Sequence, residues 1–291
     1  MTSRRRKAII RRRIFIAVLS VLLAMVLALV AACSIPLINF LFAKEEQDNV
    51  STGAGSTSSV ALPSEIESSQ EATSSEPEII TTPTGVELDA NFGRLLLING
   101  KNPLPEDYDT NVREYLVEID EKYRNNNNVT KIHRDVYPYI TAMVAAAQAD
   151  GVDLRVWSPF RDYNTQNILF QRQVDKVGGD EAKAATVVAR PGTSEHNTGL
   201  CADFNMADDA FENTKMYTWM CENAEDYGFI LRYPKSKEDV TGVIYESWHW
   251  RFVGINNAKE INRLGVTLEE YIEMKNLDPT RDMYGDDSAK N

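Results

Sequence analysis

The stretch SEHNTGLCAD, from Ser194 to Asp203, organises this sequence together with ESWH, from Glu246 to His249. The chain has three histidines, and two of them lie in these runs beside carboxylates. His196 and Asp203 are separated by a short segment with a glycine, which permits a tight turn. We therefore predict that both side chains face one point, which His249 reaches from a separate strand.

Two imidazoles and one carboxylate predict a site for a single zinc ion. Catalytic zinc sites have three protein ligands and leave the fourth position to water. Glu246 would be close enough to take the proton of that water. Because residues three apart in a strand point to opposite faces, Glu246 must lie on the turn that leads to His249, or at a bulge. The alternative is a solvent-exposed glutamate.

A second group of candidates follows the run SPFRDY, from Ser158 to Tyr163, which closes a strand and opens a helix. Arg161 can bind a substrate carboxylate or steady a developing oxyanion, although a surface ion pair is the commoner role of an arginine. Gln166, on the helix that follows, either reaches the same cleft or is solvated. His133 has no partner motif, so we interpret it as structural or exposed.

The cysteines Cys33, Cys201 and Cys221 are too few for a disulfide framework. Cys201 and Cys221 either form one pair or are two buried free thiols. We predict that Cys201, which follows the strand alternation of Asp203, is a small buried residue rather than a fourth ligand, because a closed site would abolish hydrolysis.

Charge and hydropathy divide the chain into segments. Eight of its 31 Lys and Arg residues lie in the first 44 positions, which have no Asp or Glu, although the net charge is -12. The acidic remainder excludes a nucleic-acid partner. We predict a basic cytoplasmic segment at 1–13, a transmembrane signal anchor at 14–42, and a disordered linker rich in Ser, Thr and Glu at 43–87. The domain beyond it would be outside the cell membrane; cleavage of a secretory signal, or a lipoprotein at Cys33, are the alternatives.

We predict a folded domain at 88–280 and a polar tail at 281–291. Apolar periodicity and Gly or Pro stops predict helices at 111–124, 134–150, 164–177, 180–189, 214–227 and 256–264, and a capping box at 267–270 opens the last helix. Strands are expected at 154–158, 200–205, 229–233 and 248–253. Because helices and short strands mix without regular alternation, the fold class is α+β.

Residues 95–272 resemble the VanY-type D-alanyl-D-alanine carboxypeptidase family of zinc peptidases. The matching stretches are Ser158–Arg161, Pro191–Asp203, Tyr227–Pro234 and Glu246–Gly254. The resemblance implies a small antiparallel sheet flanked by helices. It also implies roles for seven residues: metal ligands His196, Asp203 and His249, general base Glu246, oxyanion-stabilising Arg161, and substrate-binding Ser194 and Gln166.

The resemblance implies removal of the C-terminal D-alanine from peptidoglycan stem peptides, with a zinc-bound water activated by Glu246 as the nucleophile. Two alternatives stay open: an inactive zinc-containing module that binds or senses the wall, and a zinc endopeptidase that cuts cross-links. The sequence does not separate D,D from L,D bonds. It departs from the family pattern at Ser247, at Pro159-Phe160 and at Cys201, where Pro, Gly-Tyr and Ala are common.

Overall fold

The computed structural model describes residues 76–281 and residue 283. The predicted cytoplasmic segment at 1–13 and the predicted membrane span at 14–42 lie outside these residues, as do most of the predicted linker and of the tail at 281–291. Within the described part of the chain, no helix is both long enough and apolar enough to cross a bilayer.

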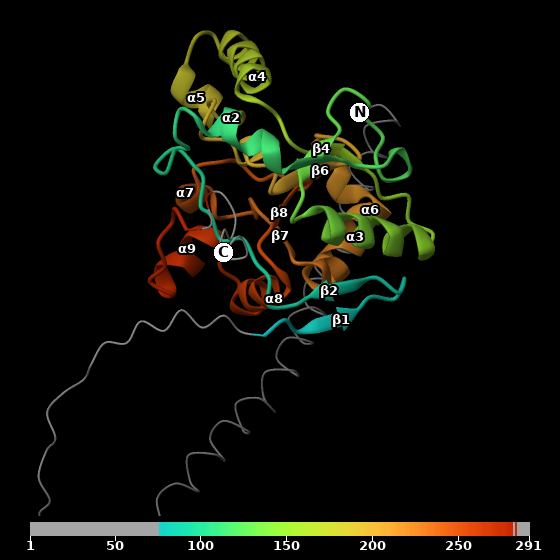
Figure 1. Cartoon of the computed structure of the whole chain (residues 1–291). Coiled ribbons are helices and arrows are strands. Elements are labelled where there is room, and N and C mark those ends of the chain that lie inside the picture. Colours follow the sequence, from blue (N-terminus) through green and yellow to red (C-terminus); the bar gives the residue numbers. More distant parts are fainter. Residues whose placement is uncertain (1–75, 282, 284–291) are drawn as a thin grey trace, which may run out of the picture. The chain divides into compact units, whose positions relative to one another are not determined.

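A four-stranded antiparallel sheet organises the domain (Figure 1). Its strand order is β5-β6-β8-β7, and the strands span Val156–Ser158, Cys201–Phe204, His249–Phe252 and Phe229–Leu231. Each strand lies inside a stretch predicted as a strand. Helices accompany this small antiparallel sheet, so the α+β class is confirmed.

Strand alternation gives the two faces of the sheet different roles. On β8, Trp250 and Phe252 join the main hydrophobic core, so His249 and Arg251 point to the opposite face. β6 pairs with β8 in a register that sets Asp203 directly opposite His249. Directly opposite residues share a face, and the register therefore brings two predicted metal ligands together.

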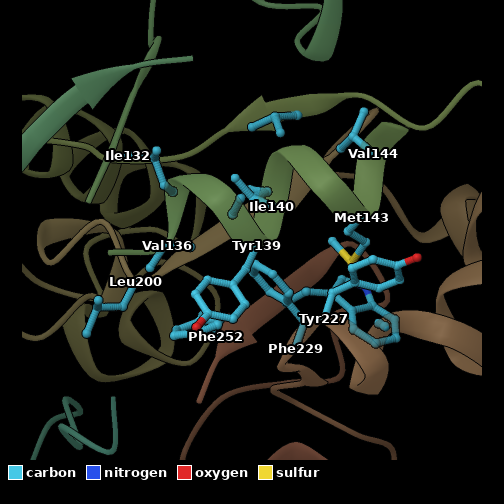
Figure 2. Close-up of a cluster of buried hydrophobic side chains, with 14 of the residues drawn as sticks. Ile132, Val136, Tyr139, Ile140, Met143, Val144, Leu200, Tyr227, Phe229 and Phe252 are labelled. Atoms are coloured by element: carbon cyan, nitrogen blue, oxygen red, sulfur yellow. The ribbon is translucent and has the colours of Figure 1, made fainter. Parts of the chain in front are cut away.

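The core face of the sheet is covered by α3, which spans Tyr137–Ala149 inside the predicted helix at 134–150. Ile140 and Met143 are fully buried. The ring of Tyr139 lies 4.7 Å from the ring of Phe252, and Figure 2 shows this contact within the cluster. Packing of α3 thus fixes β8 from behind the site.

The later helices begin near their predicted starts. They are α4 (Tyr163–Lys176), α5 (Glu181–Ala185), α6 (Lys215–Asn223), α8 (Ile255–Leu264) and α9 (Leu268–Met274), with a short α7 (Glu238–Thr241) between α6 and α8. However, α5 and α6 end before their predicted limits, and α7 was not predicted. The predicted capping box opens α9: Thr267 and Glu270 each accept the other's backbone N–H. α8 and α9 form a second apolar cluster with Leu95, Leu97 and Ile230 of β7.

The predicted helix at 111–124 is wrong. This segment contains the end of α2 (Tyr108–Asn111), a 3-10 turn (Val112–Tyr115), strand β3 (Leu116–Glu118) and another 3-10 turn (Glu121–Tyr123). β3 pairs with β4 (Lys131–His133), which sets Val117 opposite Ile132. Tertiary pairing of β-branched side chains therefore overrides the helical periodicity.

The predicted start of the domain at residue 88 is too late. Strand β1 (Ile79–Thr81) pairs with β2 (Glu87–Asp89), so residues 79–87 of the predicted linker belong to a hairpin. The Nδ2 of Asn256, in α8, donates to the Oδ1 of Asn91 just after β2. Figure 1 shows the hairpin beside α8. Backbone pairing and the burial of Leu88 in the main core order the hairpin.

β4 connects the fold to the predicted site. The N–H of Phe160 donates to the carbonyl of Lys131, and the N–H of His133 donates to the carbonyl of Gly199. The loop that carries Arg161 and the turn that carries His196 are therefore held by the same short strand. Gly199 has φ +68°, and a Cβ there would lie 2.8 Å from the backbone N of His133, so this close approach requires glycine.

Candidate active site

All seven side chains predicted from the sequence line one cleft of about 380 Å³. They come from the β5–α4 loop, the first turns of α4, the turn before β6, β6 itself, the loop before β8, and the start of β8. The seven residues are Arg161, Gln166, Ser194, His196, Asp203, Glu246 and His249.

Three donor atoms in the cleft converge. The Oδ1 of Asp203 lies 3.3 Å from the Nε2 of His196 and 3.1 Å from the Nδ1 of His249. Ligands about 2.0–2.1 Å from a tetrahedral ion lie roughly 3.4 Å from one another, which matches these separations. The residues present therefore fit one zinc ion.

The orientation of His196 is fixed from its other nitrogen. Its Nδ1 lies 2.7 Å from the carbonyl oxygen of Pro159, to which it donates, so Nε2 carries the lone pair. The backbone N–H of Arg161 donates to the carbonyl of His196, and the side chain of Asn197 donates to the carbonyl of Arg161. These bonds hold the β5–α4 loop against the turn that carries His196.

Asp203 is ionised although it is buried. Burial works against the charged form, but the two neighbouring imidazoles hold the pKa of Asp203 well below its ordinary value. A permanently charged carboxylate beside two imidazoles offers a divalent cation the oxygen ligand that it requires.

Glu246 lies on the loop before β8, as the spacing required. Its Oε2 is 3.8 Å from the Nδ1 of His249, and its backbone N–H donates to the carbonyl of Tyr233. Burial raises the pKa of Glu246 to about 7. The indole of Trp250 donates to the carbonyl of Ser247, so the loop is tied down where Ser247 departs from the family pattern.

Two polar atoms in the cleft are buried and have no hydrogen-bond partner among the described residues: the Nε of Arg161 and the Oε1 of Gln166. The Nε2 of Gln166 donates to the carbonyl of Ala189, so only its amide oxygen is left unpaired. Leaving buried polar atoms unpaired costs about 1–3 kcal/mol each. A ligand that both accepts from Arg161 and donates to Gln166 would remove this cost.

The sulfur of Cys201 is closer to the site than the sequence indicated. Cys201 is buried, as predicted, but its Sγ and one nitrogen of each of His196 and His249 all lie within 4.8 Å of one another. Cys201 and Cys221 are both free thiols. Cys221 is exposed, so the interpretation of two buried thiols is wrong for that residue.

Sequence reasoning missed Glu195. It is 1 % exposed, and its Oε2 lies 3.4 Å from the Nε2 of His249. Burial opposes its charge, but Arg232 and Arg251 hold the pKa of Glu195 well below its usual range. Its position next to His196 was the only sequence signal, since Arg232, just after β7, and Arg251, in β8, are far away in the sequence.

These donors and the adjacent carboxylate define a mononuclear zinc hydrolase. The family model for VanY, D-alanyl-D-alanine carboxypeptidase, matches residues 129–255. The putative carboxypeptidase YodJ of Bacillus subtilis (strain 168) is 37 % identical over 187 residues, which cover 62 % of this chain and 67 % of the relative. The chain belongs to the VanY family and is a zinc metallocarboxypeptidase.

Two solved structures are similar. One is the vancomycin resistance D,D-pentapeptidase VanY from a VanB-type resistance cassette, a mutant in complex with Zn(II), with 37 % identity and a TM-score of 0.50 over 61 % of this chain and 98 % of that chain. The other is the LdcB LD-carboxypeptidase, with 35 % identity and a TM-score of 0.52 over 68 % of this chain and 94 % of that chain. Both kinds of carboxypeptidase therefore share this fold.

Proposed function

We propose that the chain removes the C-terminal D-alanine from peptidoglycan stem peptides, outside the cell membrane. The observation that carries the proposal is the convergence of His196 Nε2, Asp203 Oδ1 and His249 Nδ1 beside the carboxylate of Glu246. The names of the relatives support the reaction, since they include D,D- and L,D-carboxypeptidases.

His196, Asp203 and His249 are the proposed zinc ligands. Zinc bound there supplies a Lewis acid, which polarises a carbonyl oxygen and lowers the pKa of water. Asp203 contributes the only negative charge among the three ligands. The hydrogen bond from His196 to Pro159 keeps the ligand nitrogen deprotonated.

Glu246 is the proposed general base. A carboxylate whose pKa is raised toward 7 takes a proton from water more readily than an ordinary glutamate does, and it can return that proton to the leaving amino group. The residue is only 8 % exposed, so bulk solvent competes little for the proton.

Arg161 and Gln166 are the proposed partners of the peptide. The free Nε–H of Arg161 donates to the oxyanion that develops at the scissile carbonyl. The free Oε1 of Gln166 accepts an N–H of the substrate. Ser194 lines the same cleft and is 5 % exposed. Its hydroxyl can rotate to donate or to accept a hydrogen bond.

The proposed location rests on the first residues of the chain. A basic segment at 1–13 precedes an apolar segment at 14–42, and this order supports a cytoplasmic basic side with the domain outside. Membrane anchoring through this segment therefore forms part of the proposal.

A wall-binding or sensing module that keeps zinc only for structure is disfavoured by Glu246, because a binder has no use for a buried carboxylate with a raised pKa. A zinc endopeptidase would use the same residues. The two peptidases differ in products, since a carboxypeptidase releases a single amino acid and an endopeptidase divides cross-linked dimers.

Mass spectrometry of defined substrates tests the proposal. The full chain with zinc is incubated with a stem pentapeptide, a stem tetrapeptide and a cross-linked dimer. We expect loss of one D-alanine from a free stem, with the pentapeptide assigning D,D and the tetrapeptide L,D cleavage. Intact free stems and divided dimers would support the endopeptidase. No product from any of them would support the binding module.

A further inference from the structure

Glu195 is a buried charged residue beside the site, and none of the roles proposed above includes it. Both of its carboxylate oxygens are occupied, and by different partners. Oε1 accepts from the Nε of Arg232 and from the Nη1 of Arg251, each at 2.7 Å. Oε2 is left facing the Nε2 of His249 at 3.4 Å.

We infer that Glu195 is a positioning residue for the metal centre: it accepts the Nε2–H of His249 and thereby presents the Nδ1 of that ring to the metal. The inference rests on the proposed ligand set. A neutral imidazole carries one N–H and one lone pair. An acceptor fixed at Nε2 places the proton there and leaves the lone pair on Nδ1, the nitrogen that lies 3.1 Å from Asp203.

The two arginines fix the carboxylate rather than merely neutralise it. Because both bind Oε1, the carboxylate plane cannot rotate without breaking two charge-assisted hydrogen bonds, each about twice as strong as a neutral one. Arg251 is itself held by the carbonyl of Leu96, to which its Nη2 donates at 2.7 Å. Its Nε donates to the carbonyl of Phe252 at 2.9 Å.

Arg232 is anchored from its far side. Its Nη1 and Nη2 donate to the two oxygens of Glu269, at 2.8 and 2.7 Å, and Glu269 lies in α9. The Nδ2 of Asn99 donates to the same carboxylate at 3.2 Å. Two glutamates and two arginines carry no net charge together, so the cluster orients the ring without repelling a cation.

A purely structural ion cluster is the competing interpretation, and it predicts a different pattern among variants. If Glu195 only stabilises the fold, its loss and the loss of Glu269 should lower stability and leave metal affinity alone. If Glu195 positions His249, only changes at Glu195 should weaken the metal site of the folded protein.

The test measures zinc release from the folded full chain to a chromogenic chelator, together with thermal unfolding. We expect Glu195→Gln to weaken zinc binding about 10- to 100-fold, because the two arginines hold the amide oxygen and the amide NH2, a donor, then faces the imidazole N–H. The matched control Glu269→Gln should lower the unfolding temperature and leave zinc release unchanged. Folded Glu195→Gln with wild-type zinc release would overturn the inference.

Glu195→Gln leaves two buried arginines short of charge, so it can fail to fold. Glu195→Asp keeps the charge and withdraws the oxygens by one methylene, and we expect faster zinc release from it as well. ¹⁵N NMR of the zinc-loaded wild type tests the inference without any variant, because it shows which ring nitrogen of His249 carries the proton. A protonated Nε2 and a metal-bound Nδ1 at His249 support the inference, and the reverse assignment overturns it. A wild-type chain that binds no zinc would instead defeat the proposed function.

Discussion

His133, His196 and His249 are all buried, yet their neighbours give them different roles. The two histidines of the cleft face Asp203, whereas His133 lies near the guanidinium groups of Arg94 and Arg134. The Nδ1 of His133 accepts the backbone N–H of Asp135, so this ring is neutral. Burial, helped by the two arginines, lowers the pKa of His133 to about 3. The sequence interpretation of His133 as structural agrees with this environment.

His133 should make the stability of the domain depend on pH. The unfolded ring takes up a proton below about pH 6.5, whereas the folded ring stays neutral down to about pH 3. Its contribution is therefore complete above pH 6.5 and decreases as the pH falls toward 3. Between pH 7 and 4.5 we expect the wild type to lose roughly 2 kcal/mol more unfolding free energy than His133→Asn, which keeps an acceptor for Asp135. Equal losses in urea titrations of both proteins would contradict this.

At the residue scale the sequence predicted the positions of the chemistry and missed what supports it. His196, Asp203 and Glu246 follow from spacing and strand alternation, because local geometry fixes where they point. Glu195 and the closeness of Cys201 to the site could not be predicted in this way, since they depend on strands that are far away in the sequence. Arg251 is 56 residues from Glu195, and no local pattern indicates their contact.

At the scale of elements, the site residues are positioned by turns and loops more than by helices. Most helices were predicted because apolar spacing and capping residues are local signals. The segment at 111–124 was wrongly predicted as a helix, because β3 gains its stability only by pairing with β4. β4 in turn approaches Gly199 so closely that only a residue without a side chain fits.

Gly199→Ala should damage both the fold and the metal site. An L-residue at φ +68° is strained by about 1–2 kcal/mol, and the new Cβ would meet the N of His133 at 2.8 Å. Because Gly199 joins His196 to β6, we expect weaker zinc binding as well as a lower unfolding temperature.

The matched control is Gly265→Ala, at φ +66° with no atom within 4 Å of a new Cβ. It carries the same backbone strain in open space at the end of α8. It should lower stability and keep zinc affinity. If both variants bound zinc equally well, the close approach at Gly199 would not position the site.

At the scale of the whole molecule, the metal centre joins parts of the chain that contact one another only in the folded state. Its ligands come from a 3-10 turn and two strands, and the unfolded chain has no such arrangement. Zinc should therefore bind the folded state preferentially and stabilise it, by about 2.7 kcal/mol when free zinc is 100-fold above its dissociation constant.

Removal of zinc should lower the unfolding temperature by several degrees, given about 2–4 °C for each kcal/mol in a domain of this size. Differential scanning calorimetry with a chelator measures the shift, and added zinc should reverse it whereas added magnesium should not. If the unfolding temperature did not change after a verified loss of zinc, the three ligands would not act together.

The most direct test of the central claim is Glu246→Gln, measured for zinc content and for hydrolysis of a stem peptide in one preparation. The amide keeps the shape of the side chain and cannot accept the proton of water. We predict one zinc ion per chain, as in the wild type, and turnover reduced by at least about 100-fold. Near wild-type hydrolysis, or loss of the zinc, would contradict the claim that Glu246 is the base beside an intact metal site.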